Sequence, residues 1–239
     1  MRPGRLVTGF VLIACLLNAS MAAEPPRPAP KPIQVDPGQK VVSKAKSAGK
    51  SAFLRPPGAD RYASDQEDWS EIPAWRQASF FGVRARGQFF IYVVDCSGSM
   101  EDEDRLTRAK DALRQSVRGL REPQRFHVIF YNDQPIMMPG ALARSAGVTE
   151  KSQLSAWLRL IEPDGETDPR AALSLAIAQR PDAIFLLSDG LYPEGTVEAV
   201  ARINKRKVPI HCVDLSGGVA GDQLQRIAHE SGGKYAARP

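Results

Sequence analysis

The chain has 239 residues, enough for one ordinary domain with appended segments rather than two full domains. Its hydrophobic content of 43% suits a globular core, and its 25% of charged residues is average. The formal charge of +5 comes largely from the N-terminal third. A basic bias confined to one segment indicates a solvated linker or a contact with an anionic surface, and argues against a fold specific for nucleic acid.

Residues 1–23 are typical of a signal peptide. Two arginines precede an apolar stretch over residues 6–17, and small residues at 20–22 suit a signal peptidase. The apolar stretch is short for a membrane-spanning helix. Residues 12–15 also resemble a bacterial lipobox, so simple cleavage, a lipid anchor on Cys15 and a retained membrane anchor all remain open. Each alternative predicts an extracytoplasmic protein, which is periplasmic, secreted or membrane-anchored.

Residues 24–78 are expected to form a flexible linker rich in proline and lysine. Such a stretch buries too little apolar area to offset the entropy lost on ordering. Near its end, Trp69 and Trp75 are candidates to pack on the edge of the following domain. The linker lysines could contact an anionic envelope surface. They are Lys31, Lys40, Lys44, Lys46 and Lys50.

From residue 79 to residue 239 the pattern is that of a folded domain. Residues 80–83 and 88–94, separated by four residues that include Gly87, predict a hairpin that leads into a buried strand. The second run is almost continuously apolar, as in a strand covered on both faces. Further strands are predicted by similar runs at residues 125–131, 134–138, 183–187, 210–215 and 232–236.

Helices are predicted between these strands. Asp102 or Asp104 could cap the first helix, whose apolar residues recur at helical spacing from Leu106 to Leu120. The other helices are expected at residues 149–160, 168–179 (with Pro169 in the first turn), 195–205 and 221–230. Alternating strands and helices predict an α/β fold with a doubly wound, mostly parallel sheet flanked by helices. The expected strand order is 3-2-1-4-5-6.

Two aspartates follow strands that this order makes neighbours. Asp95 ends the first buried strand and Asp189 ends the fourth, so their carboxylates should face one crevice at the point where the strand order reverses. Ser97 and Ser99 lie in the loop after Asp95, and Thr167 lies in a loop that can approach it. Carboxylate and hydroxyl oxygens suit Mg²⁺ or Mn²⁺, and the absence of nearby His or Cys ligands argues against zinc.

These five residues resemble the metal-ion-dependent adhesion site of the von Willebrand factor A family. Asp95, Ser97 and Ser99 match its Asp-x-Ser-x-Ser motif, Thr167 matches its later threonine, and Asp189 matches its last aspartate. The resemblance covers roughly residues 80–238. It implies that the metal ligands are Asp95, Ser97, Ser99, Thr167 and Asp189.

The resemblance also implies a function. Three neutral hydroxyls and two carboxylates leave a divalent ion electrophilic, with open coordination positions. In the family, an Asp or Glu from a partner protein completes the coordination, which predicts metal-dependent protein binding or adhesion. Glu166 stands where the family commonly has glycine. It could deform the loop if positive φ is needed there, or point to solvent and add negative charge to the rim.

A run of acids at residues 101–104 allows two interpretations. The acids could make the rim selective for a partner with basic residues around its acidic anchor. Alternatively, they could simply oppose the dipole in the first turn of the following helix. The five candidate ligands have a structural alternative as well, because Ser, Thr and Asp are common at turns and caps.

Two other classes of function compete with a binding protein. A Mg²⁺-dependent phosphotransferase of the haloacid dehalogenase type would need a general acid/base Asp where this chain has Ser97, and Cys96 has no identifiable His partner. No enzymatic activity is therefore expected. A structural envelope protein with a vestigial metal site is the remaining alternative.

Overall fold

The computed structural model describes residues 68–140, 142–218 and 221–238. The predicted signal peptide at residues 1–23 and most of the predicted linker at residues 24–78 lie outside these ranges. Within the described ranges, every helix is too short or too polar to cross a bilayer.

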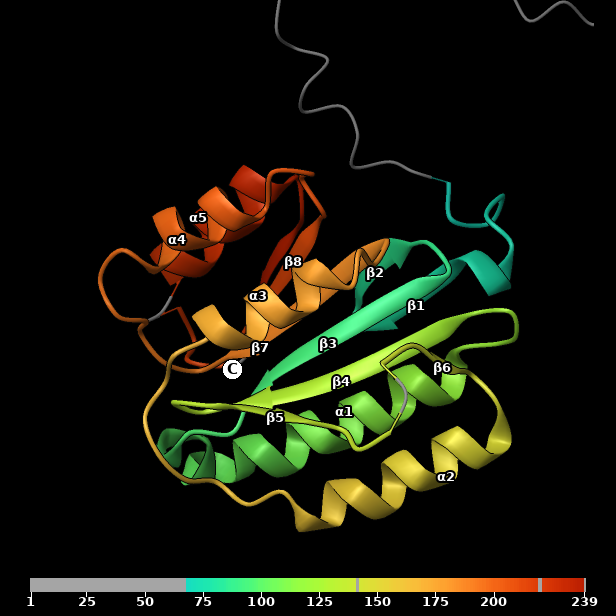
Figure 1. Cartoon of the computed structure of the whole chain (residues 1–239), viewed down its shortest axis with the longest axis horizontal. Coiled ribbons are helices and arrows are strands. Elements are labelled where there is room, and N and C mark those ends of the chain that lie inside the picture. Colours follow the sequence, from blue (N-terminus) through green and yellow to red (C-terminus); the bar gives the residue numbers. More distant parts are fainter. Residues whose placement is uncertain (1–67, 141, 219–220, 239) are drawn as a thin grey trace, which may run out of the picture. The chain divides into compact units, whose positions relative to one another are not determined.

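A central sheet forms the middle layer of the domain, with the order β5-β4-β3-β7-β8-β9 (Figure 1). The strands β4, β3, β7, β8 and β9 run parallel, whereas β5 and the short β6 pair antiparallel with β4. With β5 counted as the third strand, this is the predicted order 3-2-1-4-5-6, which is confirmed. The strands are β3 (Phe89–Asp95), β4 (Arg125–Tyr131), β5 (Pro135–Met137), β6 (Arg144–Ser145), β7 (Ala183–Ser188), β8 (Ile210–Asp214) and β9 (Tyr235–Ala237).

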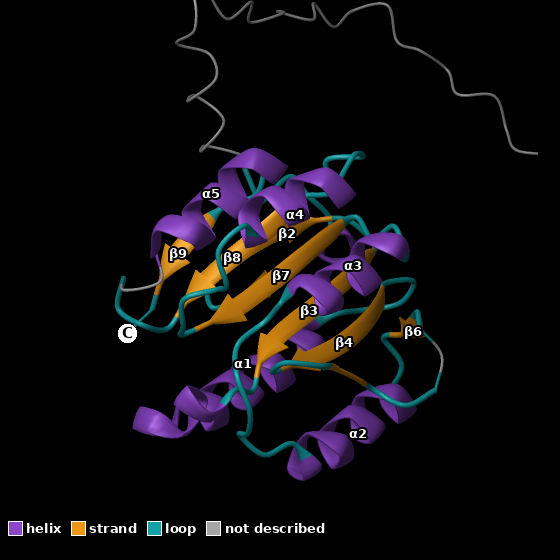
Figure 2. Ribbon diagram, turned by 60° about the vertical axis from the view of Figure 1, so that its left-hand side comes forward, coloured by secondary structure: helices purple, strands orange, loops and turns teal. Residues whose placement is uncertain are grey.

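Helices cover both faces of this sheet (Figure 2). Along β3, Tyr92 and Val94 belong to the core on one face, while Ile91 and Val93 belong to the core on the other. This division explains the continuous apolar run, because each residue of a strand covered on both faces meets a helix or a strand. The first face is covered by α1 (Arg105–Gly119) and α2 (Val148–Trp157), and the second by α3 (Arg170–Ala178), α4 (Thr196–Ile203) and α5 (Gly221–Ser231).

The predicted hairpin exists, but its position was wrong. It joins β1 (Gln77–Phe80) to β2 (Val83–Arg86), rather than residues 80–83 to residues 88–94. The turn is Phe81-Gly82, with both residues at positive φ, and such two-residue turns match the twist of paired strands. Gly87 lies between β2 and β3. A larger residue would not fit there, because a Cβ would lie 2.3 Å from the Cβ of Asp182.

The hairpin covers the sheet beside α1. Phe80 is buried, and its ring packs edge-on against Tyr92 of β3 and Phe185 of β7. The segment before β1 also packs on the domain, because Arg84 and Lys234 lie over the ring of Trp69. The expected packing of Trp69 is therefore confirmed, and β1 begins two residues before the predicted domain start at residue 79.

The start of α1 differs in detail from the prediction. A 3-10 segment, η5 (Gly98–Asp104), joins β3 to α1 and contains Glu103 and Asp104 at positive φ. Asp104 occupies the N-cap position as predicted, but its side chain makes no capping hydrogen bond. Similarly, Pro169 is the N-cap of α3 rather than a residue of its first turn. The C-terminal end of α2 continues as a 3-10 turn over Leu158–Leu160.

Candidate metal site at the ends of β3 and β7

Asp95 is the last residue of the central strand β3 and is fully buried. Its Oδ1 accepts a hydrogen bond of 2.8 Å from the backbone N–H of Ser97, and its Oδ2 accepts one of 2.7 Å from the Ser188 hydroxyl. The hydroxyl of Tyr131 lies 3.3 Å from the same Oδ2. Burial raises the pKa of Asp95 to about 6, although the hydrogen bonds from Ser188 and Ser97 oppose the shift. The carboxylate is thus positioned firmly in surroundings that disfavour its charge.

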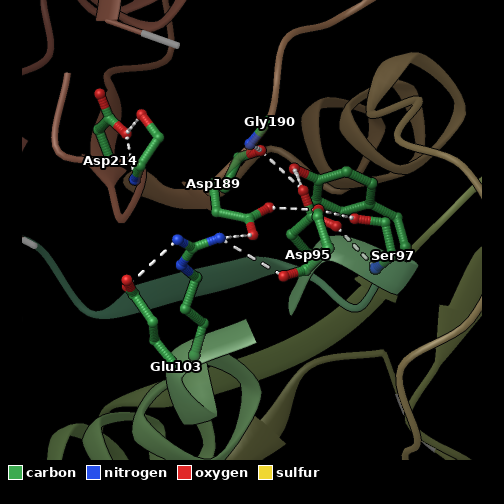
Figure 3. Close-up of polar contacts among 11 residues, drawn as sticks. Asp95, Ser97, Glu103, Asp189, Gly190 and Asp214 are labelled. Carbon is green, nitrogen blue, oxygen red and sulfur yellow. Dashed lines mark hydrogen bonds and ion pairs between the residues drawn. The ribbon is translucent and has the colours of Figure 1, made fainter. Parts of the chain in front are cut away.

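A chain of oxygen atoms connects the end of β3 to the end of β7 (Figure 3). The Ser97 hydroxyl lies 3.2 Å from the Ser99 hydroxyl, which donates a hydrogen bond of 2.9 Å to Oδ1 of Asp189. Asp189 directly follows β7, and β7 pairs with β3 in parallel, so both strands end at the same edge of the sheet. The structure therefore brings four of the five predicted ligands, Asp95, Ser97, Ser99 and Asp189, into one hydrogen-bonded cluster.

Thr167 reaches the edge of this cluster on a separate loop. The loop is fixed to the end of β3 by two backbone hydrogen bonds, from Asp164 N–H to the Cys96 carbonyl at 2.9 Å and from Gly98 N–H to the Gly165 carbonyl at 3.0 Å. A Cβ placed on Gly190, the residue after Asp189, would lie 3.4 Å from the Thr167 hydroxyl. Thr167 thus lies beside the Asp189 turn.

Glu166 does not require the conformation that only glycine adopts easily. Positive φ falls on the preceding Gly165, at +78°, and the non-glycine residues with positive φ in the described ranges do not include Glu166. Glu166 is exposed. Of the two predicted consequences, a deformed loop is therefore not observed, and the side chain adds negative charge to the rim.

The donor set fits a divalent metal ion. In an octahedral shell with metal–oxygen bonds of about 2.1 Å, adjacent ligand oxygens lie roughly 3 Å apart. The distances from the Ser99 hydroxyl to the Ser97 hydroxyl and to Asp189 Oδ1, 3.2 and 2.9 Å, match that spacing. Within the described part of the chain, no three His, Cys, Asp or Glu side chains gather as a metal site. The candidate site has two carboxylates, so its remaining ligands would be the hydroxyls of Ser97, Ser99 and Thr167.

The site becomes more exposed from its base outwards. Asp95 and Ser97 are buried, Asp189 is 6% exposed, and Ser99 is exposed at the surface. An ion held here would therefore contact solvent or a partner on the Ser99 side.

Sequence reasoning missed three residues that contact the carboxylates. Ser188 and Tyr131 could have been found, because they are the last residues of the two strands that flank β3. Tyr131 is paired directly with Asp95 in the sheet register. The third is Arg105, the first residue of α1, whose guanidinium lies 3.0 Å from Asp189 Oδ2. Nothing in the spacing of the motif indicates that contact.

Exposed acidic side chains lie next to the candidate ligands in the sequence of both loops. The acids at residues 101–104 lie in η5, ahead of α1, and the first turn of α1 itself contains none. They are exposed, as are Glu162, Asp164 and Glu166 on the facing loop. A hollow of about 380 Å³ lies between the two segments. The residues that line it include Glu101, Asp104, Glu162, Lys110 and Arg159.

A larger groove of about 750 Å³ lies between the β1–β2 hairpin and α1. Its lining includes Phe81, Arg84 and Gln115, and none of the five predicted ligands. The oxygen cluster therefore lies outside this larger groove.

Comparison with known proteins identifies the fold independently. The family model for the von Willebrand factor type A domain matches residues 90–237. That range contains all five predicted ligands. A search of curated protein sequences finds no match.

Solved structures share the fold at low sequence identity. A von Willebrand factor type A protein from Catenulispora acidiphila has a TM-score of 0.59 at 16% identity, over 66% of this chain and 40% of that chain. An aerotolerance-related membrane protein from Bacteroides fragilis has a TM-score of 0.51 at 19% identity, over 64% and 92%. Proximal thread matrix protein 1 from the mussel byssus, solved with a zinc-occupied MIDAS motif, has a TM-score of 0.51 at 16% identity, over 62% and 41%.

Proposed function

Because the chain belongs to the von Willebrand factor type A family, we propose that it is an exported binding protein that captures a protein partner through Mg²⁺ or Mn²⁺. The observation that carries this proposal is the oxygen cluster formed by Ser97, Ser99 and Asp189 above the buried Asp95. The ion would be held by these four residues together with Thr167.

The charge balance of the site favours binding of an acidic side chain. Two carboxylates can at most neutralise a divalent ion, and hydroxyl ligands add no negative charge. The ion therefore keeps its affinity for a further oxygen anion, and a partner Asp or Glu on the exposed Ser99 side would supply one. A contact of this kind is directional and is lost when the metal is removed.

The acidic rim narrows the chemistry of that partner. The exposed acids at residues 101–104 and the exposed Glu166 would repel a carboxylate that arrives with a negative surface around it. A partner with basic residues around its acidic anchor would instead be attracted. Because the acids at residues 101–103 precede the N-cap of α1, opposition to the helix dipole accounts for them poorly.

Export is proposed from the signal-like residues 1–23. The fold is shared with the membrane protein from Bacteroides fragilis, which is consistent with this location. An enzymatic role is not proposed, since Ser97 stands where a phosphotransferase of this topology would need a carboxylic acid.

Metal binding is tested by the melting temperature of the full chain in Mg²⁺, in Mn²⁺ and in chelator. A ligand at a hundred times its Kd stabilises the native state by about 2.7 kcal/mol, which corresponds to a rise of roughly 5–10 °C for a domain of this size. We expect this rise in the natural chain and its loss in Asp189→Asn. Asp214→Asn is the matched control, since Asp214 is also a buried carboxylate at the end of a parallel strand, but it accepts its hydrogen bonds from Ser216 and Tyr235.

An equal rise in all three proteins, or no rise in any, would contradict the metal site. Partner capture is then measured with and without chelator. Capture that is indifferent to chelator would leave metal binding intact but refute metal bridging.

A further inference from the structure

Arg105 places a positive charge of the protein itself at the candidate metal site. Its Nη1 lies 3.0 Å from Oδ2 of Asp189, whose side chain is fully buried, while the Arg105 side chain is 17% exposed. Figure 3 shows Asp189 and Glu103 on either side of this guanidinium, and its Nη2 lies 3.2 Å from Oε2 of Glu103. Arg105 therefore bridges a buried carboxylate and an exposed one.

Both oxygens of Asp189 are engaged by these contacts. Oδ1 accepts the hydrogen bond from Ser99, itself a candidate ligand, and Oδ2 accepts the hydrogen bond from Arg105. A guanidinium offers a full positive charge and several donors in one plane, so it satisfies a carboxylate in much the same way as a bound cation does. A divalent ion that approaches Asp189 would meet a carboxylate whose charge is already compensated, and would be repelled by the adjacent arginine.

The guanidinium is not fully satisfied in this position. Its Nε is buried and has no hydrogen-bond partner. An unpartnered buried donor raises the energy of the arrangement. The alternative partner, Glu103, has a side chain that is 69% exposed and belongs to the kinked segment before α1. Arg105 can thus release Asp189 and stay paired with Glu103 at the surface.

Resting on the proposed metal site, we infer that Arg105 is a resident counter-ion of Asp189 that a divalent metal displaces onto Glu103. The pair Arg105–Glu103 then sets the affinity of the site for its ion. In the metal-free protein Arg105 stabilises Asp189, and in the metal-bound protein the ion takes over that role. Metal binding is weakened by the free energy needed to break the Arg105–Asp189 contact.

The test measures the Mg²⁺ affinity of the full chain by calorimetry. Arg105→Gln removes the competing charge, and we expect Mg²⁺ to bind roughly five- to tenfold more tightly, the range of a partly buried ion pair. Glu103→Gln removes the alternative partner, and we expect binding to weaken about two- to threefold. Arg114→Gln is the matched control, because Arg114 lies on the same helix and loses the same charge, but pairs with Asp111. Its affinity should stay within about twofold of the natural chain.

A second readout separates competition from a general effect on the fold. In chelator, Arg105→Gln should melt at a lower temperature than the natural chain, because Asp189 loses its counter-ion. In saturating Mg²⁺ the difference should disappear. Should Arg105→Gln fold poorly, Arg105→Lys keeps the charge but cannot bridge two carboxylates with a planar group, and should show a smaller gain of affinity.

The outcomes distinguish the inference from the function on which it rests. Equal Mg²⁺ affinity in Arg105→Gln and the natural chain, or weaker affinity in the variant, overturns the counter-ion role and leaves the metal site standing. Mg²⁺ binding by Arg105→Gln but not by the natural chain supports the counter-ion role, because the arginine would then prevent metal binding altogether. Absence of binding in both proteins overturns the metal site and the counter-ion role together.

Discussion

At the scale of single residues, Asp95 stands out because its charge is costly in the metal-free protein. It is fully buried, and its pKa of about 6 lies above the usual 3.8 chiefly because burial disfavours the carboxylate. At pH 7 the carboxylate is ionised in both the native and the unfolded chain. The raised pKa therefore lowers the free energy of unfolding by its full amount at this pH. A divalent cation bound beside this carboxylate would offset the cost.

Asp95→Asn should therefore stabilise the metal-free protein while abolishing metal binding. The neutral amide removes a penalty of about 1–3 kcal/mol, given 1.36 kcal/mol for each pKa unit. The Ser188 hydroxyl can rotate to accept a hydrogen bond from the new amide. Chemical denaturation at pH 7 in chelator measures the gain, and the Mg²⁺-dependent rise in melting temperature should vanish. A variant less stable than the natural chain would show that the hydrogen bonds to Asp95 outweigh its desolvation.

Five candidate ligands could be named from the sequence because Asp95 and Asp189 follow neighbouring strands and all five positions resemble the family's motif in type and order. Arg105 could not, because its place depends on two successive residues, Glu103 and Asp104, in the left-handed conformation. Glutamate adopts this conformation seldom and aspartate only occasionally, and nothing local in the sequence demands it. The resulting kink aims the first side chain of α1 at Asp189.

At the scale of elements, the loop that carries Thr167 depends on Gly165. Its φ of +78° is a conformation that glycine adopts without strain and other residues seldom adopt. A Cβ there would also lie 3.0 Å from Nδ2 of Asn132 and 3.0 Å from Oδ1 of Asp133. The backbone carbonyl of Gly165 also accepts a hydrogen bond from Gly98, between the two serines of the site. The loop and the serine turn therefore move together.

Gly165→Ala should displace the loop and weaken metal binding. We expect a loss of stability of about 1–2 kcal/mol from the backbone strain, together with a higher Kd for Mg²⁺ as Thr167 moves. Gly119→Ala is the control, since a Cβ at this last residue of α1 would meet nothing within 4 Å. It should be neutral or slightly stabilising. Unchanged Mg²⁺ affinity in Gly165→Ala would show that Thr167 is not a ligand.

The hairpin shows where pattern reasoning fails at this scale. The residues around it are apolar on both sides of Arg84, so alternation alone does not place the turn. What decides the register is that Phe80 must reach Tyr92 and Phe185 in the core. That demand is tertiary and is absent from the local sequence.

At the scale of the whole molecule, two buried histidines predict acid sensitivity. Burial is the main cause that lowers the pKa of His127 and of His211 to about 4, with smaller contributions from Arg144 and Lys234. In the unfolded chain both titrate near 6.5, so between pH 6.5 and 4 the unfolded state binds more protons. Stability should therefore be full above pH 6.5 and fall as the pH drops towards 4, by up to about 2–3 kcal/mol for each histidine.

Denaturation curves at a series of pH values measure this slope. His127→Leu should flatten it, since both ring nitrogens of His127 are buried without a partner and an apolar side chain removes the protonation. Asp95 acts in the opposite direction over pH 6 to 3.8, because its native form binds the extra proton, so the background for the comparison is Asp95→Asn. A slope that is the same with and without His127 would contradict the assignment.

The sheet itself was predictable because its rules act along the whole chain. Alternation of strands and helices fixes parallel pairing, and the strand order brings Asp95 and Asp189 to one edge. The ends of elements, such as Pro169 before α3, depend on local contacts that the pattern does not contain.

Strand β3 has a hydrogen-bonded neighbour on each side and is buried at every residue. Its amides should be the last in the domain to exchange with deuterium, because they open only when the whole domain unfolds. Ser99 and Thr167, by contrast, lie on surface loops whose amides are reached by small local openings. An ion at this site would thus enter and leave through fluctuations of the outer loops, at a rate that does not depend on global unfolding. The carboxylate of Asp95, at the bottom of the site, would stay in place throughout.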